Sequence, residues 1–474
     1  MKYAPGMSES RGLPRRVARW AVKRYYADIE IIDGERIPQG GAVLLCANHA
    51  NSLVDSVVVG ITAQRPVRFM AKATLFDVPV FGTIMRALGM VPAFRGIDDQ
   101  SQVRRNLESL QTGAGVLIEG HAMGIFPEGM STDEMHLVKV RTGAARMALQ
   151  AVEEGTPDVR IAPIGIAYEH KERFRSSVLV RVAEPIVAAE FLDAEDGNVP
   201  RARRAITAEL DARLKGVAIH LENPEWEPWL ADLETLVPAP SGSSGSPGSP
   251  GSSGSSGSPG SSGSSKSSTA ALWQRKRIAD AINYFWENDQ PRAEALAAQI
   301  TAYRDDVHAV GLRLDSEVLR LSGFGVLFKL LGRLLWLAVL LIPALLGTIH
   351  FIVPFVLVRA LDRWLGEPGK MTVATHKLMY GIPVYVLWHL GVIAALWFFV
   401  DARIALVWLL VAPFAGALAL DYARKARRLL RLLYHETRVA LRREPLHSLR
   451  EQRAAIRERL GEMAAEFAEV SPGL

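Results

Sequence analysis

The sequence LLCANHANSLVDS places a histidine, His49, six positions before an aspartate, Asp55. A carboxylate that holds one nitrogen of an imidazole leaves the other nitrogen available to remove a proton from a hydroxyl group. The carboxylate has this orienting role in serine-protease triads, but here no serine accompanies the pair. The two side chains are therefore candidates for a general base and its orienting partner.

The residues around this pair predict where it lies in the fold. An apolar run at residues 41–46 has the length of a buried strand, and the polar residues 48–52 follow it as a turn and helix N-cap. Asp55 then falls in the first turn of a helix, where the helix dipole favours a carboxylate. The alternative is an ordinary capped helix start beside a solvated histidine, and spacing alone does not separate the two interpretations.

Three further blocks follow within the first 190 residues. MVPAFRGID (residues 90–98) sets an arginine beside a glycine, GIFPEGMS (residues 124–131) sets a carboxylate after a Phe-Pro turn, and IAPIGIAYE (residues 161–169) is an apolar strand interrupted by Pro and Gly. The order and spacing of the four blocks resemble the glycerophospholipid acyltransferase superfamily, which includes glycerol-3-phosphate and lysophosphatidate acyltransferases. The resemblance covers about residues 13–190.

The resemblance implies a role for residues in each block. His49 would be the general base and Asp55 its partner, and the acceptor, a glycerol phosphate in the family, would bind at the second and third blocks. The basic start of a helix after the third block, with Lys139 and Gly143, also resembles many members. Together with Lys72, a possible point charge for an anionic acceptor, the predicted substrate-binding residues are Arg95, Gly96, Glu128, Gly129, Ser131, Lys72, Lys139 and Pro163, the last near the acyl-donor channel.

Several of these residues have simpler interpretations. The alternative for Arg95 is a surface ion pair with Asp98 or Asp99, and the alternative for Lys72 is an ordinary exposed lysine. Glu128 cannot itself attract phosphate, so we expect it to hold an arginine or a hydroxyl in place, with a helix N-cap as the alternative.

The sequence departs from the commonest family pattern in two ways. Five residues separate His49 from Asp55 where four are usual, and FPEGMS replaces the more usual FPEG-Thr-Arg-Ser. The longer spacer, with Asn51 two places after the histidine, resembles a branch that includes fungal-type glycerol-3-phosphate acyltransferases. The acceptor therefore stays open between glycerol 3-phosphate, a lysophospholipid, dihydroxyacetone phosphate, a lyso-amino-lipid or another lipid-related alcohol. A catalytically inactive lipid-binding or scaffold protein is the alternative of a different class.

The resemblance implies acyl-CoA or acyl carrier protein as co-substrate, and we predict no metal or cofactor. The sequence has no CxxC pair, no HExxH, no P-loop and no GxGxxG motif, and no nucleic-acid partner is predicted. Cys46, the only cysteine, ends an apolar run, so we expect a buried structural thiol rather than a nucleophile.

Composition favours an enzyme that works at a membrane. Of the 474 residues 49% are hydrophobic, mean hydropathy is +0.11 and the net charge is only +5. Residues 15–26 interleave four arginines and one lysine with Trp20, Tyr25 and Tyr26, a pattern typical of a helix in the lipid headgroup layer. A plain amphipathic helix packed on the domain is the alternative.

The chain divides at a stretch of only Ser, Gly and Pro, residues 241–265, which predicts a flexible linker. The predicted organisation is a basic amphipathic segment (1–30), an acyltransferase domain (31–237), the linker (238–268), an amphipathic helical segment (269–323), transmembrane or re-entrant helices (324–421) and a basic cytosolic helical tail (422–474).

The last third is predicted to lie in a membrane. Residues 334–358, 378–400 and 404–420 are apolar runs without charges, the third shorter than the others. Basic residues flank both ends of the first run, which favours a re-entrant hairpin broken at Pro343, Gly347 and Pro354, followed by a crossing two-helix hairpin. We expect a multi-pass protein with its catalytic domain on the cytoplasmic face, in a bacterial inner membrane given the excess of Arg over Lys with abundant Ala and Gly.

The fold class combines these interpretations. Short apolar strands at residues 42–46, 67–71, 115–119, 160–166 and 178–182 alternate with helical stretches, which predicts an α/β acyltransferase domain with a mixed sheet flanked by helices. The C-terminal part is predicted to be an all-α membrane domain.

Overall fold

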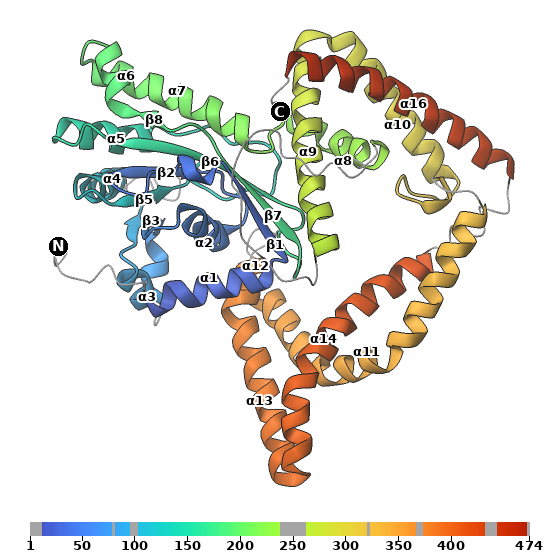
Figure 1. The fold of residues 1–474 in the computed structure, drawn as a ribbon. Helices are drawn as coiled ribbons and strands as arrows, with labels where there is room; N and C mark the ends of the chain where they lie inside the picture. Colours follow the sequence, from blue (N-terminus) through green and yellow to red (C-terminus); the bar gives the residue numbers. More distant parts are fainter. Residues whose placement is uncertain are drawn as a thin grey trace, which may run out of the picture. The chain divides into compact units, whose positions relative to one another are not determined.

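The computed structural model describes residues 12–77, 81–94, 103–237, 262–319, 323–365, 373–431 and 443–471 (Figure 1). Its contacts divide the chain into two compact units. The first comprises Met1–Pro224, Ser252–Ala279 and Pro368–Thr375, and the second comprises Glu225–Gly251, Asp280–Glu367 and His376–Leu474.

The first unit is built on one eight-stranded sheet with the strand order β1-β7-β6-β2-β5-β3-β4, in which β8 also pairs with β6. Only the β6 pairings with β7 and β8 are antiparallel, so the sheet is mixed, as predicted. The strands are β1 (Asp28–Ile32), β2 (Val43–Ala47), β3 (Val67–Lys72), β4 (Val91–Ala93), β5 (Ala122–Ile125), β6 (Arg160–Tyr168), β7 (Ser177–Val182) and β8 (Ile186–Val187).

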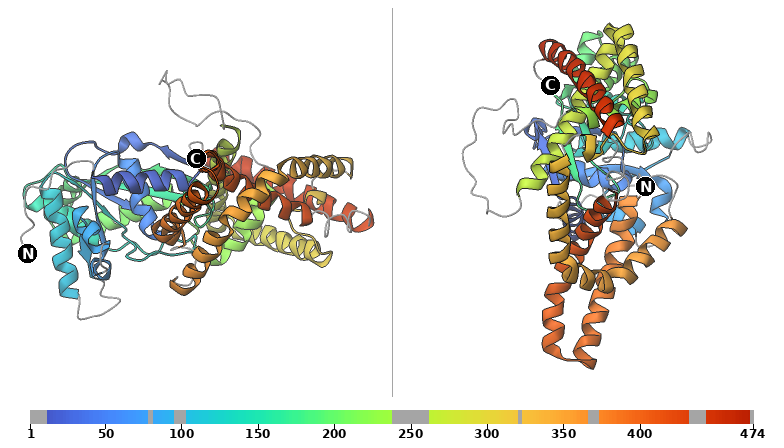
Figure 2. Two further views of the ribbon diagram at one scale, coloured as in Figure 1. Left: turned by 90° about the horizontal axis from the view of Figure 1, so that it is seen from below. Right: turned by 90° about the vertical axis from the view of Figure 1, so that its right-hand side faces the viewer.

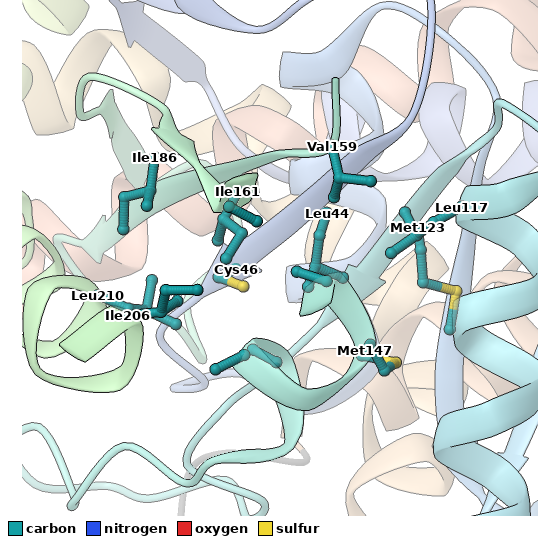
Figure 3. Close-up of a cluster of buried hydrophobic side chains, with 14 of the residues drawn as sticks. Leu44, Cys46, Leu117, Met123, Met147, Val159, Ile161, Ile186, Ile206 and Leu210 are labelled. Atoms are coloured by element: carbon teal, nitrogen blue, oxygen red, sulfur yellow. The ribbon is translucent and has the colours of Figure 1, made fainter. Parts of the chain in front are cut away.

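Helices cover both faces of this sheet (Figure 1). Helices α5, α6 and α7 lie on one face, and α1 and α2 lie on the other. The buried cluster in Figure 3 joins Leu44 and Cys46 of β2 to Leu117 of α4, Met147 of α5 and Leu210 of α7. The helices are α1 (Leu13–Tyr25), α2 (Ser52–Ala63), α3 (Phe81–Ala87), α4 (Val103–Ile118), α5 (Gly143–Glu153), α6 (Ala188–Ala194) and α7 (Val199–Val217).

The strand predicted at residues 115–119 is wrong. Helix α4 continues to Ile118, because Leu110, Ala114 and Leu117 recur at helical spacing and are all buried in the core. A short apolar run fits either a strand or a buried helix, so its length did not decide between them. The strand in this part of the chain is β5, only four residues long, which the prediction missed together with β1, β4 and β8.

The second unit and the segment before it are helical. Helix α9 (Ser262–Asn288) begins inside the predicted linker. The last residues of that linker, 262–268, are therefore helical rather than flexible, and the rest of 238–268 lies outside the described residues. Helices α10 (Gln290–Ala309) and α16 (Arg443–Val470) agree with the helical character predicted for residues 269–323 and 422–474. Helix α8 (Glu227–Leu236) lies within the range predicted for the acyltransferase domain, where no helical segment was named.

Among the described residues, three helices are long and apolar enough to cross a membrane: Leu330–Trp364, Val373–Phe399 and Ala402–Arg427. They correspond to α11 (Gly323–Leu365), to α12 (Val373–His376) with the π-helical segment η6 (Lys377–Gly381) and α13 (Ile382–Phe399), and to α14 (Ala402–Arg431). Figure 2 shows α13 and α14 as the two arms of a hairpin.

The broken hairpin predicted for residues 334–358 is replaced by one continuous helix. The helical hydrogen bonding of α11 runs through Pro343 and Pro354, both inside the helix. Proline removes a hydrogen bond and kinks a helix without necessarily ending it. Figure 1 shows the result, a bent α11 that descends to its middle and rises again. Whether this helix crosses or re-enters a bilayer stays a prediction.

Close contacts hold the membrane-type helices together. A Cβ atom on Gly347 would lie 2.1 Å from the carbonyl oxygen of Ala415, so α11 and α14 meet there backbone to backbone. Nearby, the indole of Trp408 donates to His350 Nδ1 at 3.1 Å, and His350 Nε2 lies 3.0 Å from His389 Nδ1 of α13. Small residues and interhelical hydrogen bonds of this kind are typical of helix packing in membranes.

Candidate active site

The candidate site lies where β2 ends and α2 begins. The side chain of Asn48 accepts from Ile166 N at 2.7 Å and donates to Ile166 O at 3.0 Å, which ties this junction to β6. The chain then turns sharply, with Ser52 in the left-handed region at φ 47°. The turn puts His49 on a short loop anchored on one side by the strand and on the other by the helix.

His49 and Asp55 form the predicted pair. His49 Nδ1 lies 2.9 Å from Asp55 Oδ2, and the side chains are 12% and 0% exposed. Because an ionised carboxylate only accepts hydrogen bonds, the neutral imidazole carries its proton on Nδ1 and leaves Nε2 unprotonated. This is the arrangement that a general base requires.

Asp55 is held by donors from three directions. Besides the imidazole, Asn51 N donates to Oδ2 at 2.7 Å and the hydroxyl of Tyr168 donates to Oδ1 at 2.6 Å. The carboxylate is fully buried, so these bonds replace the water that would otherwise solvate it. The orientation of the imidazole is therefore fixed by its partner, and the partner is fixed by strand β6 and the backbone.

The Phe-Pro-Glu-Gly turn packs directly on His49. The ring of Phe126 stacks on the imidazole with centroids 3.9 Å apart and planes 8° from parallel. Glu128 accepts from His49 N at 2.8 Å and from Val138 N at 3.1 Å, so its carboxylate supports the backbone of the base. Burial raises the pKa of Glu128 to about 7 despite these two backbone donors. These backbone contacts are not the ones predicted for Glu128, and its hold on an arginine or a hydroxyl stays a prediction.

Position 129 requires a glycine, both for its backbone conformation and because a side chain would have little space. Its φ is 78°, and a Cβ atom there would lie 3.2 Å from Nε of Arg141. Arg141 N also donates to Pro127 O at 3.0 Å, which holds the base of the arginine against the turn. The side chain of Arg141 is exposed, and the part of the chain that the structure describes gives it no carboxylate partner.

The remaining predicted residues are spread around this centre. Ser131 is half-buried in the loop that follows the turn, and Lys139 is exposed further along this loop. Lys72 is exposed at the end of β3, and Pro163 is buried in β6 in register with Cys46. Arg95 and Gly96 lie outside the described residues. Cys46 itself is fully buried, which confirms a structural thiol, and burial raises its pKa far above the usual range.

Sequence reasoning missed several residues of the site. Tyr168 is 113 positions from Asp55, and no local signal connects the two. Lys171 also went unnoticed, although its ammonium donates to Ala50 O at 3.0 Å and pairs with Asp133 at 2.5 Å, which ties the loop after His49 to the loop after the turn. The block that contains Tyr168 was found by resemblance, but its hydroxyl was not singled out.

Comparison with known proteins shows that the chain is similar to acyltransferases. Residues 28–167 match the model of the Acyltransferase family. Glycerol-3-phosphate O-acyltransferase 1 of Saccharomyces cerevisiae is 37% identical over 103 residues, which are 21% of this chain and 13% of that protein. The lyso-ornithine lipid O-acyltransferase of Brucella abortus is 31% identical over 159 residues, 32% of this chain and 54% of that protein.

One solved structure is also similar to the chain. The 1-acyl-sn-glycerophosphate acyltransferase of Thermotoga maritima shares 17% sequence identity with it at a TM-score of 0.32, over 42% of this chain and 77% of that one.

The family match identifies residues 28–167 as an acyltransferase domain, and the named relatives that are similar to this region are acyltransferases. The aligned region spans 13% of the yeast relative and about half of the Brucella one, so the likeness concerns this domain and not whole proteins.

Proposed function

We propose that the protein is a membrane-bound O-acyltransferase that moves a fatty acyl group from acyl-CoA or acyl carrier protein to glycerol 3-phosphate or a lysophospholipid. The observation that carries the proposal is the His49–Asp55 pair, with Nδ1 held at 2.9 Å by a fully buried carboxylate and Nε2 available as the base. No other pair of titratable groups in the acyltransferase domain has this combination among the described residues.

The proposed reaction needs one proton transfer and no covalent enzyme intermediate. His49 Nε2 takes the proton of the acceptor hydroxyl as its oxygen attacks the thioester carbonyl, which gives a tetrahedral oxyanion. The carbon–sulfur bond then breaks, the ester forms, and the imidazolium returns the proton to the departing thiolate. General-base assistance of this kind is worth about 100- to 10,000-fold in rate.

An anionic acceptor needs cations near the base. Arg141, beside Gly129 and without a carboxylate partner among the described residues, is well suited to a phosphate because a guanidinium binds it in two-point fashion. We propose that Arg141 works with Arg95 here, in place of the arginine that FPEGMS lacks. Both oxygens of Glu128 accept from backbone N–H groups, and the described residues show no ion pair between Glu128 and Arg141.

Two features support the proposal that the protein binds a membrane. The first is the set of three apolar helices in the C-terminal region. The other is α1, whose Leu13, Val17 and Trp20 are 72%, 52% and 58% exposed on one face. The helix packs on the domain through buried Val22 and Tyr25, and Arg19 donates to Gly60 O at 2.7 Å, so Leu13, Val17 and Trp20 lie outside its packed face. An apolar stripe flanked by exposed basic residues suits the headgroup layer, which favours the first of the two interpretations of this segment.

A second acceptor class has support of its own. The Brucella relative is named for a lyso-ornithine lipid, and the third block of this chain lacks the usual arginine. An acceptor without a phosphate would need fewer cations at the turn. The second candidate function is therefore acylation of a lyso-amino-lipid by the same His49 chemistry.

The test is an acceptor panel. Purified full-length protein in lipid vesicles is given labelled acyl-CoA with glycerol 3-phosphate, 1-acylglycerol 3-phosphate or lyso-ornithine lipid, beside a folded His49→Ala variant. Ester formed on a phosphorylated acceptor by the wild type and lost in the variant supports the proposal. Transfer only to lyso-ornithine lipid supports the second candidate instead. Absence of transfer to every acceptor, or undiminished transfer by the variant, contradicts the proposed chemistry.

We further propose that the catalytic domain faces the cytoplasm of a bacterial inner membrane. Arg424, Lys425 and Arg427 follow the apolar part of α14, and clusters of this kind stay on the cytoplasmic side. The turn at Asp401 would then face outward. Because Cys46 is buried, a cysteine placed at Asp401 should be labelled from outside intact cells, and one at Arg424 should not. The reverse pattern contradicts this orientation.

A further inference from the structure

We infer that Tyr168 is a positioning residue of the active site, which completes a hydrogen-bonded chain from β6 through Asp55 to the imidazole of His49. Its hydroxyl donates to Asp55 Oδ1 at 2.6 Å, while Oδ2 serves His49 Nδ1 and Asn51 N. Among the described residues, Tyr168 is the donor to Oδ1. The inference rests on the proposed function, since it concerns how strongly the base is held during transfer.

The setting keeps this hydroxyl a donor. Tyr168 is 9% exposed as a residue, and its ring lies 5.5 Å from that of Tyr26, centroid to centroid. Burial, with the negative charge of Asp55, raises the pKa of Tyr168 well above its usual range, so the hydroxyl keeps its proton at any pH at which the enzyme works. An O–H donor to a buried carboxylate is one of the stronger hydrogen bonds in proteins.

The bond to Tyr168 changes what Asp55 can do for His49. A donor at Oδ1 draws carboxylate charge away from Oδ2, which lessens the stabilisation that Asp55 gives to a protonated imidazole. It also fixes the plane of the carboxylate and hence the direction in which Nε2 points. Without the donor, Oδ1 would be buried and partly unsatisfied, and water would enter or the carboxylate would rotate.

The effect of Tyr168 on the pH dependence must be distinguished from the effects of other groups that face His49 and Asp55. Glu128 touches His49 N, and the hydroxyl of Tyr26 accepts from Asn51 Nδ2 at 2.7 Å. Lys171 is bound to Ala50 O, next to the histidine. Of these, Glu128 titrates in the same range as an imidazole, because burial raises its pKa to about 7.

The test compares two buried tyrosines. Tyr168→Phe removes the donor to Asp55, whereas the matched control, Tyr26→Phe, removes a hydroxyl of similar burial that bonds to Asn51 and Lys171 O instead. We expect Tyr168→Phe to lower kcat about ten- to a hundredfold, by the loss of one hydrogen bond to a charged group, with KM for the acceptor little changed. Tyr26→Phe should change kcat less than threefold, about 0.7 kcal/mol.

The pH–rate profile distinguishes positioning from a merely structural role. Tyr168→Phe should move the acidic limb of kcat to higher pH by about half a unit or more, because the protonated imidazole gains stabilisation. A profile of Glu128→Gln identifies any part of that limb that belongs to Glu128. A simple loss of packing would lower the unfolding temperature and leave the limb in place.

A second variant keeps the inference falsifiable if Tyr168→Phe does not fold. Fluorotyrosine at position 168 retains the shape and the hydroxyl but makes it a stronger donor, so the acidic limb should move to lower pH. An unshifted limb in both variants, or wild-type kcat in Tyr168→Phe, overturns the inference. Those outcomes leave the proposed function intact so long as His49→Ala is inactive, whereas an active His49→Ala contradicts the proposed function itself.

Discussion

The acyltransferase domain and the membrane-type helices each contain a hydrogen-bonded histidine and aspartate. In the domain, His49 Nδ1 lies 2.9 Å from Asp55 Oδ2, and in the helices His376 Nδ1 lies 3.1 Å from Asp362 Oδ1. A tyrosine reaches each aspartate as well, Tyr168 at 2.6 Å and Tyr380 at 3.2 Å. By composition and distance alone, the two clusters are alike.

They differ in how firmly the pair is held. Asp55 is fully buried and receives a backbone N–H from Asn51, while Asp362 is 28% exposed. His49 stacks on Phe126 with centroids 3.9 Å apart, whereas His376 and Tyr380 lie 5.6 Å apart and 28° from parallel. A histidine–aspartate distance alone therefore does not distinguish the proposed general base from His376. What distinguishes His49 is its immobilisation by a backbone donor, a stacked ring and a fully buried carboxylate.

The second cluster has a different explanation. Asp362 lies near the C-terminal end of α11, His376 ends α12, and Tyr380 lies in the π-helical segment η6. Polar side chains in membrane-type helices pair with one another because an unpaired group in hydrocarbon is costly. The hydrogen bonds of Asp362 therefore fasten one helix to the next.

The difference between the two clusters is tested most directly by replacing each histidine in turn. His49→Ala should lower the rate of acyl transfer about 100- to 10,000-fold, because the base is lost while the bound substrates stay close together. His376→Ala, the matched control, should stay within about threefold of the wild type, roughly 0.7 kcal/mol. Initial rates of labelled ester formation in vesicles measure both. Equal losses in the two variants would mean that both pairs serve catalysis.

The sequence predicted those parts of the His49–Asp55 site that are close together in the chain, but not those that come from distant strands. His49 and Asp55 belong to one strand–turn–helix, so local patterns and the motif were enough to find them. Tyr168 and Ile166 approach this junction only because β6 pairs with β2, more than a hundred residues away along the chain. Pairing of distant strands leaves no mark on the local sequence. The motif therefore found Glu128, but not that its carboxylate supports the backbone of His49.

The next comparison is between two cations after the Phe-Pro-Glu-Gly turn. Arg141→Ala should raise KM for a phosphorylated acceptor about tenfold or more, since a charged hydrogen bond to phosphate is lost. Lys139, also predicted to bind the substrate, is exposed two residues away and offers only a point charge, so Lys139→Ala should raise KM less than about twofold, roughly 0.4 kcal/mol. Steady-state kinetics over acceptor concentration measure both. The assignment to Arg141 fails if the lysine variant shows the larger increase.

Glu128, beside the first pair, should make the stability of the folded protein depend on pH. Burial raises the pKa of Glu128 from 4.5 to about 7, so the folded state binds this proton more tightly than the unfolded state. The associated stability is fully present below pH 4.5 and is lost as pH rises through about 7. We expect a loss of about 1–3 kcal/mol.

Thermal unfolding of the full chain in detergent between pH 4.5 and 8 measures this loss. Glu128→Gln cannot titrate and should show a smaller decline than the wild type across the range. Glu134→Gln, a change at an exposed position in the following loop, should follow the wild-type curve. Parallel curves for the wild type and Glu128→Gln would show that this carboxyl group is not perturbed.

The membrane-type region was predictable to a different extent. Apolar runs located its helices because a bilayer demands about 20 uncharged residues, a signal that does not depend on distant contacts. The prolines suggested a break in the first run, but a proline within a helix is tolerated when neighbouring groups compensate for the lost bond. The contact of Gly347 with α14 depends on how the helices pack, which their composition does not specify.

The packing of α11 against α14 can be tested by replacing two glycines, and here we expect only a small change in stability. At Gly347 a Cβ atom would lie 2.1 Å from Ala415 O, whereas a Cβ atom at Gly391 of α13 would have nothing within 4 Å. Alanine favours a helix over glycine by about 1 kcal/mol, so Gly391→Ala should raise the unfolding temperature in detergent slightly. Gly347→Ala should lower it, because overpacking costs about 1–3 kcal/mol and exceeds that gain. Acyl transfer per folded molecule should be unchanged in both variants, since neither glycine touches the site of His49. If both substitutions stabilise the protein equally, α11 and α14 do not meet at Gly347.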